Sequence, residues 1–171
     1  MTDPYRIVVV CWGNICRSPM AEFVLRQAFE DEGLADQVQI TSAGTSTEEL
    51  GNAMDRRTIA VLKRKSVRDT GFGDKRAIQF HRDSFADADL ILAADYVHER
   101  ILRERAPSTE DDKKIWMLRS FDPTSVESGE LGMDDPWYGG DSDFDITYDE
   151  IVAATPGIVA FVRDELEERA G

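Results

Sequence analysis

The chain has 171 residues, of which 42% are hydrophobic and 32% charged, a composition that fits one folded domain and excludes a disordered chain. The formal net charge of −14 makes nucleic acids and anionic membranes unsuitable partners, although a locally positive site can still bind an anion. Two cysteines are too few for a disulfide scaffold, and His81 and His98 stand in no zinc-ligand pattern, so we expect no metal site.

The N-terminal residues MTDPYRIVVV do not have the basic and long apolar regions of a signal peptide. No apolar run approaches the ~18 residues that a membrane span needs. We therefore expect a cytoplasmic protein, and export by a route without a signal peptide stays open.

Apolar runs with strand character alternate with helical patterns along the chain. Strands are expected at Tyr5–Val10, Val38–Ser42, Leu90–Ala94 and Lys114–Leu118. Helices are expected at Pro19–Glu32, Asp55–Lys65, Tyr96–Arg105 and Tyr148–Ala170. This alternation predicts an α/β fold, a single domain over residues 1–171 whose parallel sheet carries helices on both faces.

Two stretches near the C-terminus are less regular. Arg119–Thr147 is polar and contains Gly and Pro, so we expect a long loop that is functional or mobile. Pro156 and Gly157 fall inside the last helical pattern and predict a kink or a break there.

The end of the first strand carries the most informative motif. Cys11–Ser18 reads CWGNICRS and leads into a helix expected to begin near Pro19. Backbone N–H groups at a helix N-terminus bind anions, and Gly13 and Asn14 permit a left-handed turn. Arg17 adds a planar fork that can hold two phosphate oxygens, so the loop is predicted to bind a phosphate-sized dianion.

The N–H groups at the helix N-terminus and the charge of Arg17 are also expected to act on Cys11. A free thiol has a pKa of about 8.5, and helix N-termini and cations lower it, so Cys11 is predicted to be a nucleophilic thiolate. Ser18 is close enough in sequence to hydrogen-bond that sulfur, and attack on phosphorus would give a cysteinyl-phosphate. An inert buried cysteine is the alternative, but the spacing to Arg17 makes it the weaker one.

Cys16 has two interpretations, which are compatible with each other. It is a small residue packed under the loop, or it is a redox partner that protects Cys11 by forming a reversible disulfide.

The sequence resembles the low-molecular-weight protein tyrosine phosphatases, most closely their actinobacterial members. The resemblance covers nearly the whole chain. It rests on VCWGNICRSPMAE (10–22), TSAGTS (41–46), GNAMDRRTIAVLKRK (51–65), ADLILAAD (88–95), WMLRSFDP (116–123) and DPWYGGDSDF (135–144). CWGNICRS and DPWYG are the most specific of these stretches.

The resemblance implies a four-stranded, Rossmann-like parallel sheet and hydrolysis of phosphotyrosine in proteins, without metal or cofactor. It implies that Cys11 is the nucleophile and that Arg17 binds the phosphate. The other loop residues expected at the phosphate are Trp12, Gly13, Asn14, Ile15, Cys16 and Ser18. The residues expected to hold the loop's strained shape are Asn14, Ser18 and Ser42. We expect a monomer whose partners are tyrosine-phosphorylated proteins and, in the loop, phosphate or another oxyanion.

A phenolate leaves more easily when its oxygen is protonated, which calls for a carboxylic acid opposite Cys11. Asp134 and Asp135 are the candidates. Pro136 favours an extended conformation at Asp135, which also matches the family's acid. Asp135 is therefore predicted to be the general acid and later the base that activates water, with a turn-capping role as the alternative for both aspartates.

Adjacent aromatic residues in this polar segment are predicted to form a slot for the substrate's phenyl ring. Trp137 and Tyr138 would form its walls, together with Trp12, and Ile15 its floor. The alternative is that Trp137 packs back onto the domain.

The sequence departs from the family pattern at two places. Glu48 and Glu49 stand where many members carry an aromatic-His pair, which predicts carboxylates at the mouth of the cleft and a preference against acidic phosphopeptides. Lys75 stands where members often have a histidine that supports Asn14. That support is therefore in question, and His81 is a possible substitute.

Other functions are compatible with the same phosphate-binding loop. Counting the cysteines excludes an arsenate reductase with an internal thiol relay, whereas one that uses an external thiol stays an alternative. Ile15 disfavours a phosphatase of arginine. A phosphotyrosine-binding module without turnover would lose the thiol or the acid, but Cys11, Arg17 and Asp135 are all present.

Overall fold

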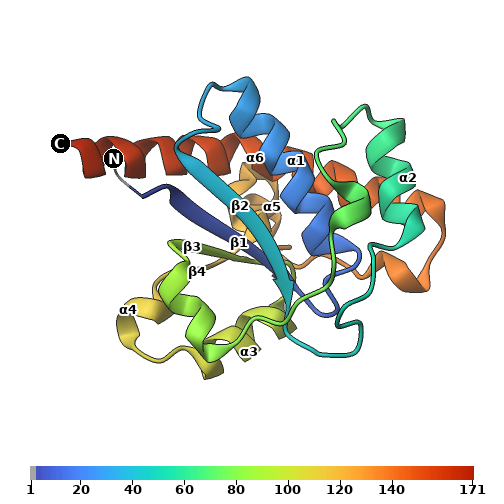
Figure 1. Ribbon diagram of the computed structural model, residues 1–171, viewed down its shortest axis with the longest axis horizontal. Coiled ribbons are helices and arrows are strands. Elements are labelled where there is room, and N and C mark those ends of the chain that lie inside the picture. The colour runs from blue at the N-terminus through green and yellow to red at the C-terminus, as the bar shows by residue number, and fades with distance from the viewer. Residues whose placement is uncertain (1–2) are drawn as a thin grey trace.

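A computed structural model describes residues 3–171, which contain a four-stranded parallel sheet (Figure 1). Its strands, in the spatial order β2-β1-β3-β4, are β1 (Tyr5–Cys11), β2 (Val38–Gly44), β3 (Leu90–Ala93) and β4 (Ile115–Met117). The central strand β1 pairs through Ile7 with Ile40 of β2 and with Leu90 of β3. The predicted strands and their parallel arrangement are confirmed.

Helices cover both faces of the sheet. They are α1 (Arg17–Asp31), α2 (Arg56–Arg64), α3 (Tyr96–Arg105), α4 (Thr109–Asp112), α5 (Pro123–Ser128) and α6 (Asp141–Ala170). Short 3-10 helices lie at Phe72–Asp74, Arg82–Asp87, Leu118–Phe121 and Pro136–Tyr138. In Figure 1, α1 and α6 lie on one side of the sheet and α3 and α4 on the other, which confirms the predicted α/β class.

Alternation along the strands divides the buried side chains into two cores. Ile7 and Val9 of β1 belong to the first core, with residues of α1 and α6 such as Leu25. Val10 belongs to the second core, which includes Leu102 of α3. Because both faces are covered, β1 is apolar on both, and Cys11 at its end is also buried.

Helix α1 begins at Arg17, two residues before the start expected from Pro19. Pro19 therefore lies in the first turn, where its missing N–H would have had no partner within the helix. This earlier start places Arg17 and Ser18 on the helix itself.

The prediction of one long loop at Arg119–Thr147 is wrong. This stretch contains α5 and the start of α6, and polar residues that resemble loop residues act as helix caps there. The Asp122 carboxylate accepts a hydrogen bond from the N–H of Thr124 at 3.0 Å at the start of α5.

Of the kink or break predicted at Pro156, the break is wrong, because α6 continues through Pro156 and Gly157. Buried residues on either side, among them Ile151 and Ile158, hold this helix against the first core. Gly157 has a packing role: a Cβ on it would lie 2.2 Å from the carbonyl oxygen of Phe121.

Within residues 3–171, no helix has both the length and the apolar character that crossing a membrane requires.

Candidate active site

A cavity of ≈ 140 Å³ opens at the carboxyl end of β1, the edge of a parallel sheet where ligands usually bind. Three separate segments line it. They contribute Cys11, Trp12, Gly13, Ile15, Cys16, Arg17, Glu48, Glu49, Asp135, Trp137 and Tyr138. The structure thus brings together the predicted nucleophile, arginine, acid and aromatic residues, and it places both glutamates at the same cavity.

Hydrogen bonds to neighbouring segments fix the backbone of the loop that follows Cys11. The carbonyl of Trp12 accepts from the N–H of Ser46 at 3.0 Å, and that of Ile15 from the N–H of Asp55 at 2.9 Å. These bonds hold two of the loop's carbonyls against the segments that follow β2.

Asn14 is the left-handed residue of this loop, with φ of 61°, and Gly13 is not in that region. The buried side-chain amide of Asn14 holds this strained backbone conformation through both its oxygen and its nitrogen. Oδ1 accepts from the N–H of Ile78 at 3.1 Å, and Nδ2 donates to Ser18 Oγ at 2.8 Å and to Ser42 Oγ at 2.9 Å. The three residues that were predicted to hold the loop's shape therefore lie in one network.

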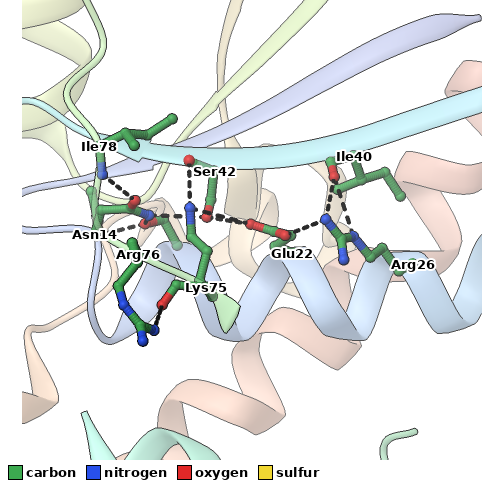
Figure 2. Close-up of polar contacts among 10 residues, drawn as sticks. Asn14, Glu22, Arg26, Ile40, Ser42, Lys75, Arg76 and Ile78 are labelled. Atoms are coloured by element: carbon green, nitrogen blue, oxygen red, sulfur yellow. Dashed lines mark hydrogen bonds and ion pairs between the residues drawn. The ribbon is translucent and has the colours of Figure 1, made fainter. Parts of the chain in front are cut away.

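The Asn14 amide connects the two serines to Glu22 through hydrogen bonds (Figure 2). The Ser42 hydroxyl donates to Glu22 Oε1 at 2.5 Å, so its oxygen accepts from Asn14. Ser18 Oγ likewise accepts from Asn14 and lies 2.9 Å from Cys11 Sγ, so its proton can bond the sulfur when Cys11 is a thiolate. A chain of four polar side chains thus holds a hydroxyl beside the sulfur.

Glu22 is almost fully buried and is neutralised by two cations (Figure 2). Arg26 Nη2 lies 2.5 Å from Glu22 Oε2, and Lys75 Nζ lies 3.7 Å from Glu22 Oε1 and donates to the carbonyl of Ser42 at 3.0 Å. Burial lowers the pKa of Lys75, and the Glu22 carboxylate opposes that shift. Lys75 therefore supports the network through Ser42 and Glu22 and makes no direct bond to Asn14.

The suggestion that His81 replaces the missing support is wrong. His81 is exposed, and its N–H donates to Ser84 Oγ at 3.0 Å at the start of a 3-10 helix. It belongs to that turn.

Arg17 extends from the first turn of α1 and is buried. Its Nη1 donates to the carbonyl of Met133 at 2.9 Å and lies 3.9 Å from Asp95 Oδ2. Its Nη2 lies 3.5 Å from Asp135 Oδ2. The guanidinium therefore connects the cysteine loop to the segment that carries the predicted acid.

Asp135 caps a turn and its side chain also lines the cavity. Its Oδ1 caps the 3-10 helix by accepting from the N–H of Trp137 at 3.1 Å, while its Oδ2 faces Arg17. Asp134 is exposed and does not line the cavity. The geometry thus separates the two candidate aspartates.

The aromatic residues lie at the rim of the cavity. Trp137 and Tyr138 meet edge to face at 5.0 Å between ring centroids, and 49% and 82% of their surface is exposed, so Trp137 does not pack back onto the domain. Trp12 Nε1 donates to Glu48 Oε2 at 3.0 Å, which holds the indole against the segment after β2. Ile15 is partly buried against the first core.

Cys16 and Cys11 are both buried free thiols, but only Cys11 has Ser18 beside its sulfur. Burial and the nearby Asp55 carboxylate raise the pKa of the Cys16 thiol. Cys16 therefore stays protonated at neutral pH.

Sequence reasoning missed a buried histidine behind Arg17. His98 of α3 is fully buried, and its Nδ1 accepts from the N–H of Asp95 at 3.1 Å. Burial and the charge of Arg17 lower its pKa to about 3, so the imidazole is neutral. Its position three residues after Asp95, the residue that caps α3, was the available signal.

Among residues 3–171, no group of three or more His, Cys, Asp or Glu side chains is placed to hold a metal ion.

Comparisons with known proteins agree with this geometry. The family model described as low molecular weight phosphotyrosine protein phosphatase matches residues 6–168. The low molecular weight protein-tyrosine-phosphatase of Streptomyces coelicolor is 45% identical over 97% of this chain and 98% of its own. Protein-tyrosine phosphatase A of Mycobacterium tuberculosis is 40% identical over 97% and 96% of the two chains.

Solved structures give the same result. A protein tyrosine phosphatase from Entamoeba histolytica superposes with a TM-score of 0.86 at 27% identity and covers 94% of this chain and 98% of its own. With the family model matched over nearly the whole sequence, the chain belongs to the low molecular weight phosphotyrosine protein phosphatase family.

Proposed function

We propose that this protein hydrolyses phosphotyrosine in protein substrates through a cysteinyl-phosphate on Cys11. The observation that carries the proposal is the presence of Cys11, Arg17 and Asp135 at one cavity whose rim is aromatic. This reaction needs a sulfur nucleophile, a cation that binds the phosphate and a carboxyl group that protonates the leaving oxygen.

In the first step the Cys11 thiolate attacks phosphorus and forms the S–P bond. The bond between phosphorus and the phenolic oxygen breaks, and its electron pair goes to that oxygen, which takes the proton of the Asp135 carboxyl group. Arg17 and the N–H groups of residues 12–18 stabilise the charge on the other phosphate oxygens. The substrate's ring lies among Trp12, Trp137 and Tyr138.

In the second step the Asp135 carboxylate takes a proton from water, whose oxygen attacks phosphorus. The S–P bond breaks, its electrons return to Cys11, and inorganic phosphate leaves. The Ser18 hydroxyl, 2.9 Å from the sulfur, donates to the thiolate that is released.

We also propose a protective role for Cys16. Both thiols are buried and belong to the same loop, so an oxidised Cys11 sulfenic acid would condense with the Cys16 thiol, releasing water and forming a disulfide that a thiol reductant reverses. Peroxide inactivation that dithiothreitol reverses, but that becomes irreversible in Cys16→Ser, is the expected result.

Cys11→Ser and Asp135→Asn test the mechanism. Cys11→Ser should abolish release of phosphate from p-nitrophenyl phosphate yet still retain tyrosine-phosphorylated peptides on a column. Asp135→Asn should slow the reaction by about 10²- to 10⁴-fold. Equal, slow hydrolysis by the wild type and Cys11→Ser would instead indicate a binding module.

A further inference from the structure

Two arginines outside the cavity hold the main chain on either side of Asp135. Arg119 Nη1 donates to the carbonyl of Gly132, three residues before it. Arg57 Nη2 donates to the carbonyl of Trp137 at 3.3 Å and its Nη1 to that of Gly139 at 3.2 Å. Residues 132–139, here called the acid segment, are therefore bound by guanidinium groups near both ends.

Arg57 is itself held in place. The Asp55 carboxylate accepts from its Nε at 3.1 Å and from its Nη2 at 2.9 Å, and the guanidinium lies 4.6 Å from the ring centroid of Phe144. The N–H of Asp55 donates to the carbonyl of Ile15 in the cysteine loop. Arg57 thus connects the acid segment to the loop of Cys11 through one residue.

Arg119 has a comparable anchor on the other side. Its Nη1 lies 2.9 Å from Glu150 Oε2 of α6, and both side chains are mostly buried. The guanidinium therefore links the acid segment to a long helix of the first core.

On one side of Asp135, Met133 is also held by Arg17 and by the carbonyl of Ala94, which accepts from its N–H at 3.0 Å. From residue 134 to residue 139, the hydrogen bonds to the main chain from other described segments come from Arg57 alone. Met133 and Pro136 are buried, but Asp134, Trp137 and Gly139 are exposed. A proton donor must lie within hydrogen-bond reach of the leaving oxygen, and a shift of about 1 Å can cost ~10²-fold in rate.

We propose that Arg57 and Arg119 are positioning residues that act through Asp135, by holding the acid segment so that its carboxyl group faces the leaving oxygen. The proposal rests on the assignment of Asp135 as the general acid. Neither arginine lines the cavity, so neither touches the substrate.

The test compares two aryl phosphates, because protonation matters more for a basic leaving oxygen than for an acidic one. In Arg57→Ala and Arg119→Ala, kcat/KM for phenyl phosphate should fall about 10-fold, and kcat/KM for p-nitrophenyl phosphate by less than about twofold. Asp135→Asn should show the same selectivity with a larger loss. In a double variant that combines Asp135→Asn with either arginine substitution, kcat/KM for phenyl phosphate should be no lower than in Asp135→Asn alone.

Arg163→Ala is the matched control. It removes an arginine of α6 whose Nη2 lies 2.8 Å from Glu32 Oε2, away from the cavity, and it should change neither rate. Glu150→Gln weakens the anchor of Arg119 without removing the guanidinium. It should give the same selectivity, on a smaller scale, even where Arg119→Ala does not fold.

Equal losses on both substrates, or full additivity with Asp135→Asn, would overturn the proposal. If Asp135→Asn itself affects both substrates equally, the assignment of the acid fails, and the positioning role with it. If only Asp135→Asn is selective, the acid stands and the positioning role alone is wrong.

Discussion

Both serines behind Cys11 accept from the same Asn14 amide nitrogen. Glu22 accepts from Ser42, Ser42 accepts from Asn14, and Ser18 also accepts from Asn14, so the Ser18 proton can be donated to a Cys11 thiolate. The two serines therefore have different effects although both bind the same amide. Ser18 touches the reacting atom, whereas Ser42 lies behind it.

Substitution of each serine by alanine should separate these roles. Ser18→Ala removes the donor to the departing sulfur and should lower kcat by about 10- to 100-fold. Ser42→Ala leaves buried groups of Asn14 and Glu22 without their partner and should reduce the free energy of unfolding by about 1–3 kcal/mol. Pre-steady-state kinetics and urea unfolding measure the two effects. A larger loss of kcat in Ser42→Ala than in Ser18→Ala would contradict the assigned order.

The glutamates at the cavity should influence which substrates are accepted. Glu49→Gln removes one negative charge but keeps an oxygen that can accept from Asn52 Nδ2, now bonded at 2.7 Å. At low salt, kcat/KM should rise about two- to fivefold for phosphopeptides with acidic flanks and fall for those with basic flanks. Glu110→Gln, on a distant exposed helix, is the control. A change of the same sign for both peptides would rule out this charge effect.

The residues of the candidate site that the sequence revealed are those within continuous motifs. Cys11 and Arg17 lie in one strand–loop–helix unit, and Asp135 is indicated by the following Pro136 and by the family match. Lys75 was placed near Asn14 by the family match alone, and its partner Glu22 was not foreseen, because the two meet only when α1 and the segment after α2 pack against the same end of β2. Local spacing cannot show such contacts, although Glu22 lies one helical turn beyond Ser18.

At the scale of secondary structure, α6 shows how packing overrides local propensity. Gly157 is unfavourable inside a helix, yet the Phe121 carbonyl lies where its Cβ would be. Gly157→Ala should therefore destabilise the protein by about 1–3 kcal/mol, despite the better helix former. Ala160→Gly, at an exposed position of the same helix, should cost about 1 kcal/mol through propensity alone. Urea unfolding measures both, and a Gly157→Ala variant more stable than the wild type would refute the packing argument.

The buried imidazole of α3 gives a pH dependence of stability. The pKa of His98 falls from 6.5 to about 3 on folding, so below pH 6.5 the unfolded chain binds a proton that the folded chain does not. The stability that the neutral imidazole contributes is complete above pH 6.5 and declines as the pH falls toward 3. At pH 5 the loss is about 2 kcal/mol.

His98→Gln should remove this contribution. Between pH 7 and pH 5, the free energy of unfolding should fall by about 2 kcal/mol less in His98→Gln than in the wild type. His81→Gln, at the exposed histidine, should behave as the wild type does. An unchanged pH dependence in His98→Gln would mean that this histidine is not the titrating group.

The strands could be predicted because they are apolar runs bounded by polar turns, and α3 because Asp95 and Pro107 frame it. The start of α6 could not be predicted in this way. Its first residues, such as Asp141 and Asp143, are typical of loops, and only the capping bond from the N–H of Gly140 to Asp143 Oδ2 at 2.8 Å shows their role. Polar caps and polar loops have the same composition, so pattern alone cannot separate them.

At the scale of the whole molecule, the cavity places one buried cation within an acidic protein. The chain has 34 acidic and 20 basic residues, and of the charged side chains that line the cavity Arg17 is the cation, beside Glu48, Glu49 and Asp135. The local field attracts a phosphate group, whereas the distant field repels an anionic peptide that carries it. Because salt screens distant charges more than buried ones, the two fields can be separated experimentally.

The long-range field predicts opposite salt effects for two substrates. As NaCl rises from ~10 to ~150 mM, the Debye length falls from about 30 to about 8 Å, and repulsion from the net charge of −14 is screened. For a phosphotyrosine peptide with acidic flanks, kcat/KM should therefore rise, and for one with basic flanks it should fall. A phosphopeptide with neutral flanks, measured in parallel, corrects for direct effects of chloride at the cavity. Parallel slopes for the acidic and basic peptides would show that only the groups at the cavity, and not the charge of the whole protein, control the encounter with substrate.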